Sequence, residues 1–90
     1  MEKWEVGDVC VVCGSPYICH HHIFPGVYRR KVSDSYGYVI PLCVEHHTGQ
    51  HGIHRDRALA EYWMVRAQEH FEQNYGTRND FIRIFGKSFI

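Results

Sequence analysis

The sequence lacks long apolar segments, repeats and a net charge. In its 90 residues no stretch reaches the ~20 apolar residues that a membrane span requires, and no apolar run follows Met1-Glu2-Lys3. We therefore expect a cytoplasmic protein without a signal peptide or membrane contact. Ten basic and ten acidic residues cancel, which argues against tight non-specific binding to nucleic acid. Without repeats or low-complexity segments, a single domain over residues 1–90 is expected.

Cysteine and histidine are the informative residues. The chain has four cysteines and eight histidines, and seven of the histidines lie between His20 and His54. A domain of this length buries only about 60% of the surface that its unfolded chain exposes, so a disulfide or a metal ion often supplements its core. Because cytoplasmic thiols stay reduced, the cysteines indicate a bound metal before a disulfide.

The N-terminal half predicts a pair of strands. Residues 17–24 and 36–42 are rich in strand-forming side chains, and a polar loop from Arg29 to Ser35 is expected between them. Two such strands would pair in the antiparallel direction. A short helix is expected to open at Cys43.

The C-terminal half predicts two helices. Apolar residues from 59 to 71 recur at i, i+3 and i+4, which is typical of an amphipathic helix, and Asp56 is a plausible N-cap for it. Thr77 and Asp80 have the spacing of a capping box, which predicts a short final helix that ends near Gly86. The aromatic residues of both helices are assigned to the core.

Two ligand pairs predict a closed metal site. Cys10-x-x-Cys13 and Cys43-x-x-His46 each allow both side chains to turn toward one ion. Four sulfur and nitrogen ligands suit tetrahedral zinc and leave no open position for chemistry, so we interpret the site as structural. Zinc binding of this type can supply on the order of 10–16 kcal/mol, which offsets a thin core. Cys19 fits neither pair and is expected to be a small core residue on a strand.

The remaining histidines between residues 20 and 54 form two groups. They are His20, His21, His22, His47, His51 and His54. A shared zinc site would bring the two groups together, where they could hold a second ion. Imidazole suits Zn, Mn, Fe or Ni better than Ca, and an ion with few protein ligands keeps open positions for water and substrate.

Two segments resemble the motif of HNH endonucleases, namely His21-His22-Ile23-Phe24-Pro25 and Leu42-Cys43-x-x-His46-His47. The chain is also similar to small HNH proteins of phages and prophages in Cys-x-x-Cys-Gly, in Gly52-Ile53-His54 and in the C-terminal Phe-x-x-Ile-Phe-Gly. The resemblance implies a small α+β protein. Its ββα-metal core (HNH, or His-Me finger) would cover about residues 10–56, with a long amphipathic helix and a short helix over about 57–86.

The resemblance also assigns roles to individual histidines. His21 takes the position of the first metal ligand, His22 that of the general base, and His47 that of the second metal ligand. The third ligand is His54, which matches the phage-type Gly-Ile-His pattern, or alternatively His51, which lies four residues after His47.

One position departs from the family pattern. The middle Asn of the motif fastens the loop that orients the general base, and Tyr38 stands in its place, so another group has to hold this loop. The departure and the neutral charge slightly favour a second interpretation, in which the chain is a non-catalytic zinc-stapled module that binds nucleic acid or protein. The His21-His22 pair and His47 favour the nuclease more strongly, since a pure scaffold needs no second histidine cluster.

The activity implied by the resemblance is the hydrolysis of DNA phosphodiester bonds. The catalytic ion would be Mg²⁺ or Mn²⁺, and Zn²⁺ or Ni²⁺ could also occupy the histidine site. One site cuts one strand, so we expect a monomer or weak dimer that nicks double-stranded DNA with low sequence specificity. Arg29, Arg30 and Arg55 are expected to contact phosphates. The family suggests phage packaging or recombination proteins as partners.

Overall fold

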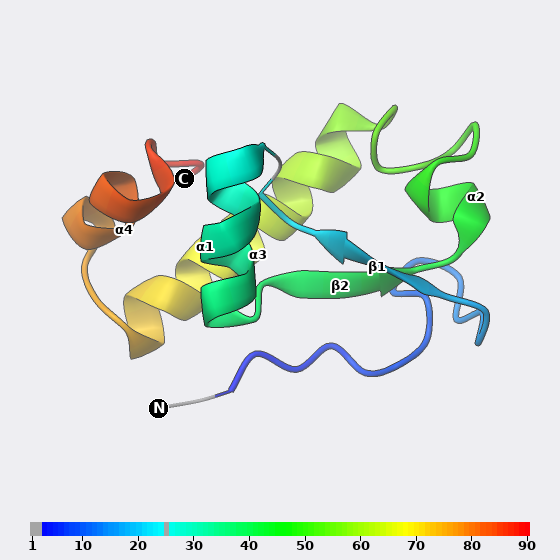
Figure 1. Cartoon of the computed structure of the whole chain (residues 1–90), viewed down its shortest axis with the longest axis horizontal. Helices are drawn as coiled ribbons and strands as arrows, with labels where there is room; N and C mark the ends of the chain where they lie inside the picture. The colour runs from blue at the N-terminus through cyan, green and yellow to red at the C-terminus, as the bar shows by residue number, and fades with distance from the viewer. Residues whose placement is uncertain (1–2, 25) are drawn as a thin grey trace.

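The structure, a computed structural model, describes residues 3–24 and 26–90, without the side chains of Val27, Tyr28 and Arg30. Within this part of the chain a two-stranded sheet and four helices form a small fold of the predicted α+β class, with one helix more than the sequence predicted (Figure 1). In chain order the elements are β1 (Cys19–His22), α1 (Val27–Tyr36), β2 (Val39–Leu42), α2 (Val44–His47), α3 (Arg57–Asn74) and α4 (Arg78–Phe85). Pro25 of the HNH-like motif lies outside the described residues. None of the described helices is long and apolar enough to cross a membrane.

The two strands pair in the antiparallel direction, as predicted, but each is shorter than the sequence indicated. The register runs from Cys19 opposite Leu42 to His22 opposite Val39. Because side chains alternate along a strand, Cys19 and His21 share one face of β1 while His22 lies on the other. This alternation decides which histidines can meet.

The predicted polar loop from Arg29 to Ser35 is wrong, because this segment belongs to the helix α1. Tertiary contacts rather than local sequence stabilise the helix. Val32 and Tyr36, one turn apart, pack against the hydrophobic core. Gly37 ends the helix in the left-handed conformation, with φ 74°, and its N–H bonds back to the last turn.

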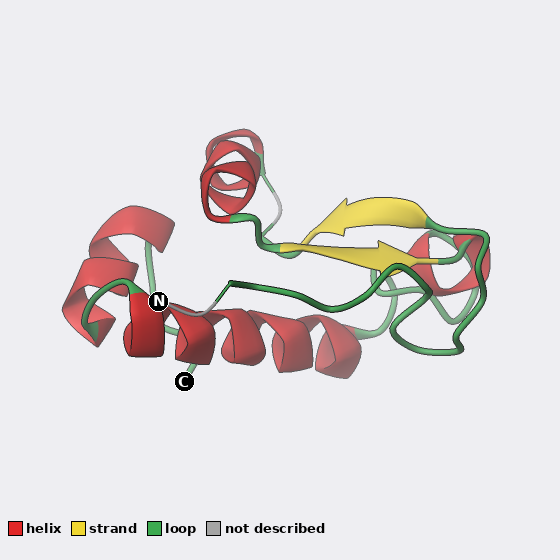
Figure 2. Cartoon of the chain, turned by 90° about the horizontal axis from the view of Figure 1, so that it is seen from below, coloured by secondary structure: helices red, strands yellow, loops and turns green. Residues whose placement is uncertain are grey.

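Aromatic side chains from both halves of the chain form the core. Phe24, Tyr38, Phe71, Phe81 and Phe85 are all buried, and the rings of Phe81 and Phe85 stack with their centroids 4.4 Å apart. Phe71 on α3 and Phe81 and Phe85 on α4 therefore have the predicted core role. The prediction is wrong for Tyr62 on α3, whose side chain is exposed. Figure 2 shows α3 along one side of the molecule, with α1 and the sheet on the other.

Both C-terminal helices begin at their predicted caps. The Asp56 carboxylate accepts the N–H of Leu59 (3.0 Å) at the start of α3. At α4, the Thr77 hydroxyl accepts the N–H of Asp80 (3.1 Å), and the Asp80 carboxylate accepts the N–H of Thr77 (2.9 Å). Gly86 ends α4 in the left-handed conformation.

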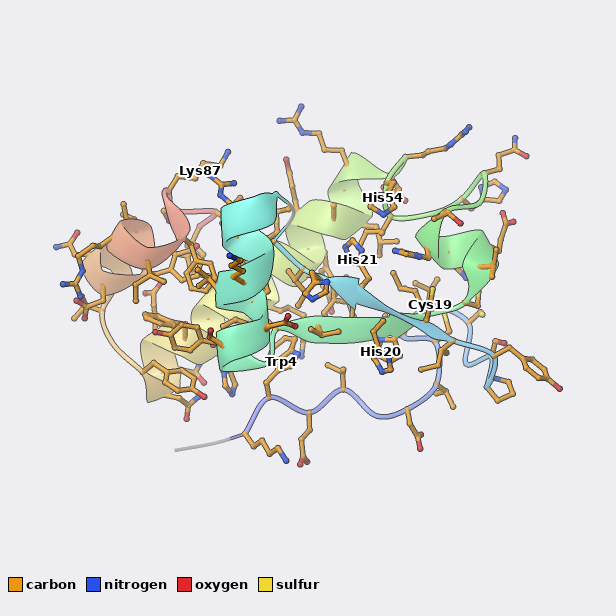
Figure 3. All side chains as sticks on the ribbon, viewed as in Figure 1. Trp4, Cys19, His20, His21, His54 and Lys87 are labelled. Carbon is orange, nitrogen blue, oxygen red and sulfur yellow. The ribbon has the colours of Figure 1, made fainter. Side chains whose placement is uncertain are left out.

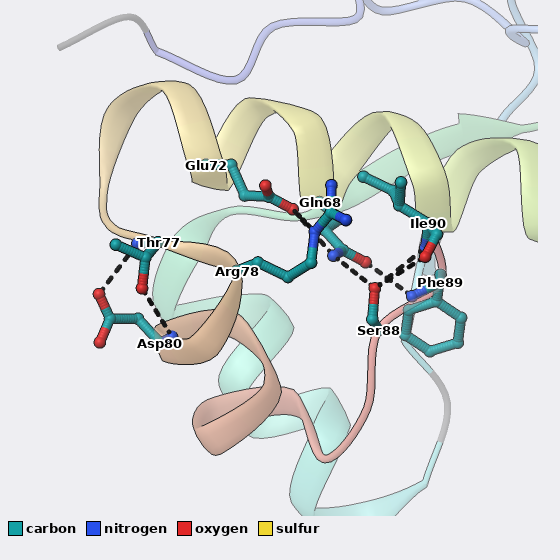
Figure 4. A network of polar contacts seen from close by, with 8 residues as sticks. All are labelled: Gln68, Glu72, Thr77, Arg78, Asp80, Ser88, Phe89 and Ile90. Carbon is teal, nitrogen blue, oxygen red and sulfur yellow. Dashed lines mark hydrogen bonds and ion pairs between the residues drawn. The ribbon is translucent and has the colours of Figure 1, made fainter.

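A buried glutamine fixes the C-terminal tail, a feature that the sequence did not reveal. The Gln68 amide on α3 donates to Ser88 Oγ (3.0 Å) and to Glu72 Oε2 (2.9 Å), and its oxygen accepts the N–H of Phe89 (2.7 Å) (Figure 4). All the hydrogen-bonding groups of a fully buried side chain are thus used. The tail therefore returns to α3 and places the Phe89 ring 5.5 Å from that of Phe24.

Candidate metal centres

The predicted closed site is assembled from two short segments. The first is a turn in which the N–H of Gly14, at a φ of 80°, donates to the carbonyl of Cys10 (2.8 Å), so that Cys10 and Cys13 come together. The second is the start of α2, where Cys43 is the N-cap and His46 follows one turn later. The N–H of Val11 in the turn donates to the carbonyl of Pro41 on β2 (3.1 Å), and β2 leads directly into Cys43. This hydrogen bond holds the two segments against each other.

The donor atoms of these four residues fit a tetrahedral ion. With Zn–S near 2.3 Å and Zn–N near 2.0–2.1 Å, a tetrahedral zinc ion has S···S edges of about 3.8 Å and S···N edges of about 3.6 Å. The Sγ atoms of Cys13 and Cys43 are 3.7 Å apart. Nδ1 of His46 lies 3.2 Å from Sγ of Cys43 and 3.8 Å from Sγ of Cys10. All four cysteines of the chain are free, so this Cys₃His cluster could hold a structural metal ion.

The electrostatics of Cys10 also suit a metal ligand. Burial by itself would raise the pKa of its thiol, but backbone N–H groups of Cys43, Cys13 and Val12 outweigh this effect and lower the pKa to about 6. The thiolate is the form that binds a metal. Cys10 therefore offers this form at neutral pH.

Three histidines from separate segments form a second cluster. His47 ends α2. His21 lies on β1 and His54 lies in the loop before α3 (Figure 3). Their ring centroids form a triangle with sides of 5.3, 5.1 and 5.0 Å. One nitrogen of each ring lies within 4.8 Å of the others. A point between the three rings therefore lies within about 2.8 Å of all three nitrogens. If each nitrogen moved toward that point by less than about 1 Å, it would reach a metal–nitrogen bond length.

The loop after α2 brings His54, not His51, to this cluster. The sequence left both open, because His51 would follow His47 by one turn if the helix continued. The helix instead ends at His47, and the loop folds back so closely that a Cβ on Gly52 would lie 2.6 Å from the His47 carbonyl oxygen. His51 is exposed, and its ring belongs to neither cluster.

The burial of His21 and the partial burial of His47 favour the uncharged form of these two rings. Burial lowers the pKa of His21 to about 4, with smaller contributions from His54, His47 and His22. Burial and the neighbouring His54 also lower the pKa of His47. Both rings are therefore neutral at pH 7, which is the form whose lone pair binds a metal.

The expected general base, His22, contacts α1 instead of the histidine cluster. Its Nε2 lies 2.8 Å from Oδ1 of Asp34, and a quarter of the His22 side chain is exposed. His20 is exposed. His70, on α3, is within hydrogen-bond distance of the Tyr38 hydroxyl (3.0 Å).

A buried serine on α1 holds the connection between the two strands. The hydroxyl oxygen of Ser33 accepts the N–H of Phe24 (3.3 Å), and its carbonyl accepts the N–H of Tyr38 (2.7 Å). One residue of α1 thereby joins the end of β1 to the start of β2. Sequence reasoning missed Ser33, because the segment was expected to be a loop. Tyr38 itself is a fully buried core residue.

A pocket of about 300 Å³ opens beside the histidine cluster. His21 and His54 line it together with apolar side chains and with Arg55 and Arg57. Arg57 forms an ion pair with Glu61 (2.9 Å). Of the predicted phosphate contacts, Arg55 lines this pocket. Among the other predicted contacts, the guanidinium of Arg29 lies beside Gly86 at the end of α4, and the side chain of Arg30 lies outside the described part of the chain.

The interpretation of the two clusters depends on their geometry alone, because comparisons with known proteins found no family model, curated protein or solved structure that matches the chain. The structure gives a small α+β protein in which a Cys₃His cluster able to hold an ion lies next to a cluster of three histidines.

Proposed function

We propose that the chain is a metal-dependent endonuclease of the HNH type, in which a structural zinc ion in the Cys₃His cluster supports a catalytic ion held by His21, His47 and His54. The observation that carries the proposal is the convergence of three imidazoles from β1, α2 and the following loop, next to a pocket lined by Arg55. A purely structural protein has no need for a second ligand cluster beside a complete one.

The chemistry divides between the ion and the side chains around it. A divalent ion at the three histidines would bind the scissile phosphate of DNA and stabilise the negative charge that develops during hydrolysis. Three ligands leave coordination positions open, unlike the four of the closed cluster. Arg55 would contact a neighbouring phosphate and orient the strand.

His22 supplies the proton transfer in this proposal. Its Nε2 lies 2.8 Å from the Asp34 carboxylate, which can only accept a hydrogen bond when ionised, so Nε2 carries the proton of the neutral ring. Nδ1 then holds the lone pair that takes a proton from the attacking water. The contact with Asp34 also fixes the ring, as the third member of a catalytic triad does.

Nicking of supercoiled plasmid tests the proposal. With Mn²⁺ or Mg²⁺ we expect wild-type protein to give open-circle DNA before any linear product. Loss of a metal ligand in His54→Ala, or of the base in His22→Ala, should lower the rate at least about 100-fold, in the range that general-base catalysis contributes. His51→Ala is the matched control, because its ring lies nearby but outside both clusters, and it should cut like wild type. Equal cutting by His22→Ala and wild type would refute the base assignment.

A binding module without catalysis is the second candidate. The observation that favours it is the pairing of His22 with Asp34 on α1, instead of a direct approach to the histidine cluster. This candidate predicts intact plasmid with Mg²⁺, Mn²⁺ and Ni²⁺, together with retention of DNA in a mobility-shift assay. Intact plasmid in all three metals would therefore favour it over the nuclease.

A further inference from the structure

Cys19 belongs to neither ligand cluster, yet its thiol lies between two of the functional elements. Its Sγ is 3.1 Å from Nδ1 of His47 and 3.3 Å from the carbonyl oxygen of Leu42. Figure 3 labels Cys19 on the same strand as His21. The two residues share one face of β1, and the His47 ring lies against both of them.

The hydrogen-bonding capacity of these groups assigns the protons. A thiol has one proton to donate, and a carbonyl oxygen can only accept. The Cys19 thiol therefore donates to Leu42, and its sulfur accepts the proton on Nδ1 of His47. In this chain of two hydrogen bonds the neutral His47 ring is protonated on Nδ1, which leaves the lone pair on Nε2.

We propose that Cys19 is the positioning residue of the histidine cluster, because its thiol fixes His47 in the tautomer that presents Nε2 to the metal. The proposal rests on the metal site of the proposed function. Metal-binding histidines commonly donate their other ring N–H to a partner that sets both the tautomer and the orientation of the ring. In this chain a single strand face supplies one ligand, His21, and the partner of a second ligand.

Two substitutions of similar size but different hydrogen-bonding capacity distinguish a role of Cys19 in orienting His47 from a role in packing. Cys19→Val fills a similar volume without a hydrogen-bonding group, whereas Cys19→Ser keeps a group that both donates and accepts. Titration with Mn²⁺ alone, followed by calorimetry, should give about a 10- to 100-fold weaker Kd for Cys19→Val, the usual effect of losing such a partner. Cys19→Ser should recover most of the affinity, and zinc content should stay the same in all three proteins.

The tautomer of His47 can be measured directly in the wild-type protein by NMR, without an activity assay. Long-range ¹H–¹⁵N spectra of the wild-type protein, with zinc bound and Mn²⁺ absent, should show His47 protonated on Nδ1. In Cys19→Val the spectrum should move toward a mixture of tautomers. A wild-type ring protonated on Nε2 would overturn the proposal, as would an unchanged Mn²⁺ affinity in Cys19→Val or a wild-type protein that binds no Mn²⁺. If tautomer and affinity behave as expected while plasmid stays intact, Cys19 keeps its role and the nuclease proposal fails.

Discussion

Replacing His46 by alanine tests the closed cluster most directly. The cluster joins two segments whose ligands Cys13 and Cys43 are 30 residues apart. Closing a loop of this length by a cross-link removes chain entropy worth about 3–4 kcal/mol from the unfolded state. A zinc site of this class contributes as much as ~10–16 kcal/mol, which matches or exceeds the whole stability of roughly 5–14 kcal/mol expected for a domain of this size.

We therefore expect His46→Ala to lose at least about 3–4 kcal/mol of stability. At roughly 4–8 °C per kcal/mol for a domain of this size, Tm should fall by at least about 12 °C. Thermal unfolding followed by circular dichroism, with zinc measured per chain, provides the assay. The matched control is His51→Ala, which removes an exposed ring a few residues away and should stay within about 0.5 kcal/mol of wild type. A His46→Ala protein that has lost its zinc and still melts within ~2 °C of wild type would refute the reasoning.

Three further predictions concern other parts of the chain. His21 has its folded-state pKa lowered to about 4, so below pH 6.5 the unfolded chain binds more protons, and the free energy of unfolding measured with urea in Mn²⁺-free buffer should decrease from pH 6.5 to 4. His21→Asn should remove most of this decrease, whereas the exposed neighbour in His20→Asn should keep it. Gln68→Leu takes the acceptor from the N–H of Phe89 and should cost about 1–3 kcal/mol in urea unfolding, and an unchanged midpoint would contradict the role given to this amide. Asp34→Ala should slow plasmid nicking about tenfold or more at unchanged metal content, since it removes a hydrogen bond to the charged form of the base, and wild-type rates would show that the contact is incidental.

Local signals in the sequence predicted the parts of the structure that depend on near neighbours. The pairs Cys10-x-x-Cys13 and Cys43-x-x-His46 specify their own geometry, because two ligands three positions apart on a turn face the same way. The caps at Asp56 and Thr77 act within a single helical turn. These features needed no knowledge of the rest of the fold.

Features that depend on distant contacts were missed. The helix α1 is rich in charged and polar residues and packs against the core through Val32 and Tyr36. The four-residue spacing of Tyr28, Val32 and Tyr36 is a helical signal that the prediction of a loop overlooked. The hydrogen bond from the N–H of Phe24 to the Ser33 hydroxyl depends on that helix, so the prediction of a loop over this segment does not include it. His54 rather than His51 joins the cluster because of where α2 ends. The close approach of Gly52 to the His47 carbonyl, which leaves no room for a Cβ, helps to set this end.

The two clusters are linked through the four-residue helix α2. His46 belongs to the closed cluster and His47, the next residue, belongs to the cluster of three histidines. The carbonyl of His46 also accepts the N–H of Ile53 (2.8 Å), which fixes the backbone next to His54. An ion in the closed cluster therefore restrains two of the three histidines, one by direct covalent connection and one through this hydrogen bond. Because the restraint acts on backbone positions, it lowers the entropy that the second ion has to remove on binding, and occupancy of the first site should strengthen the second.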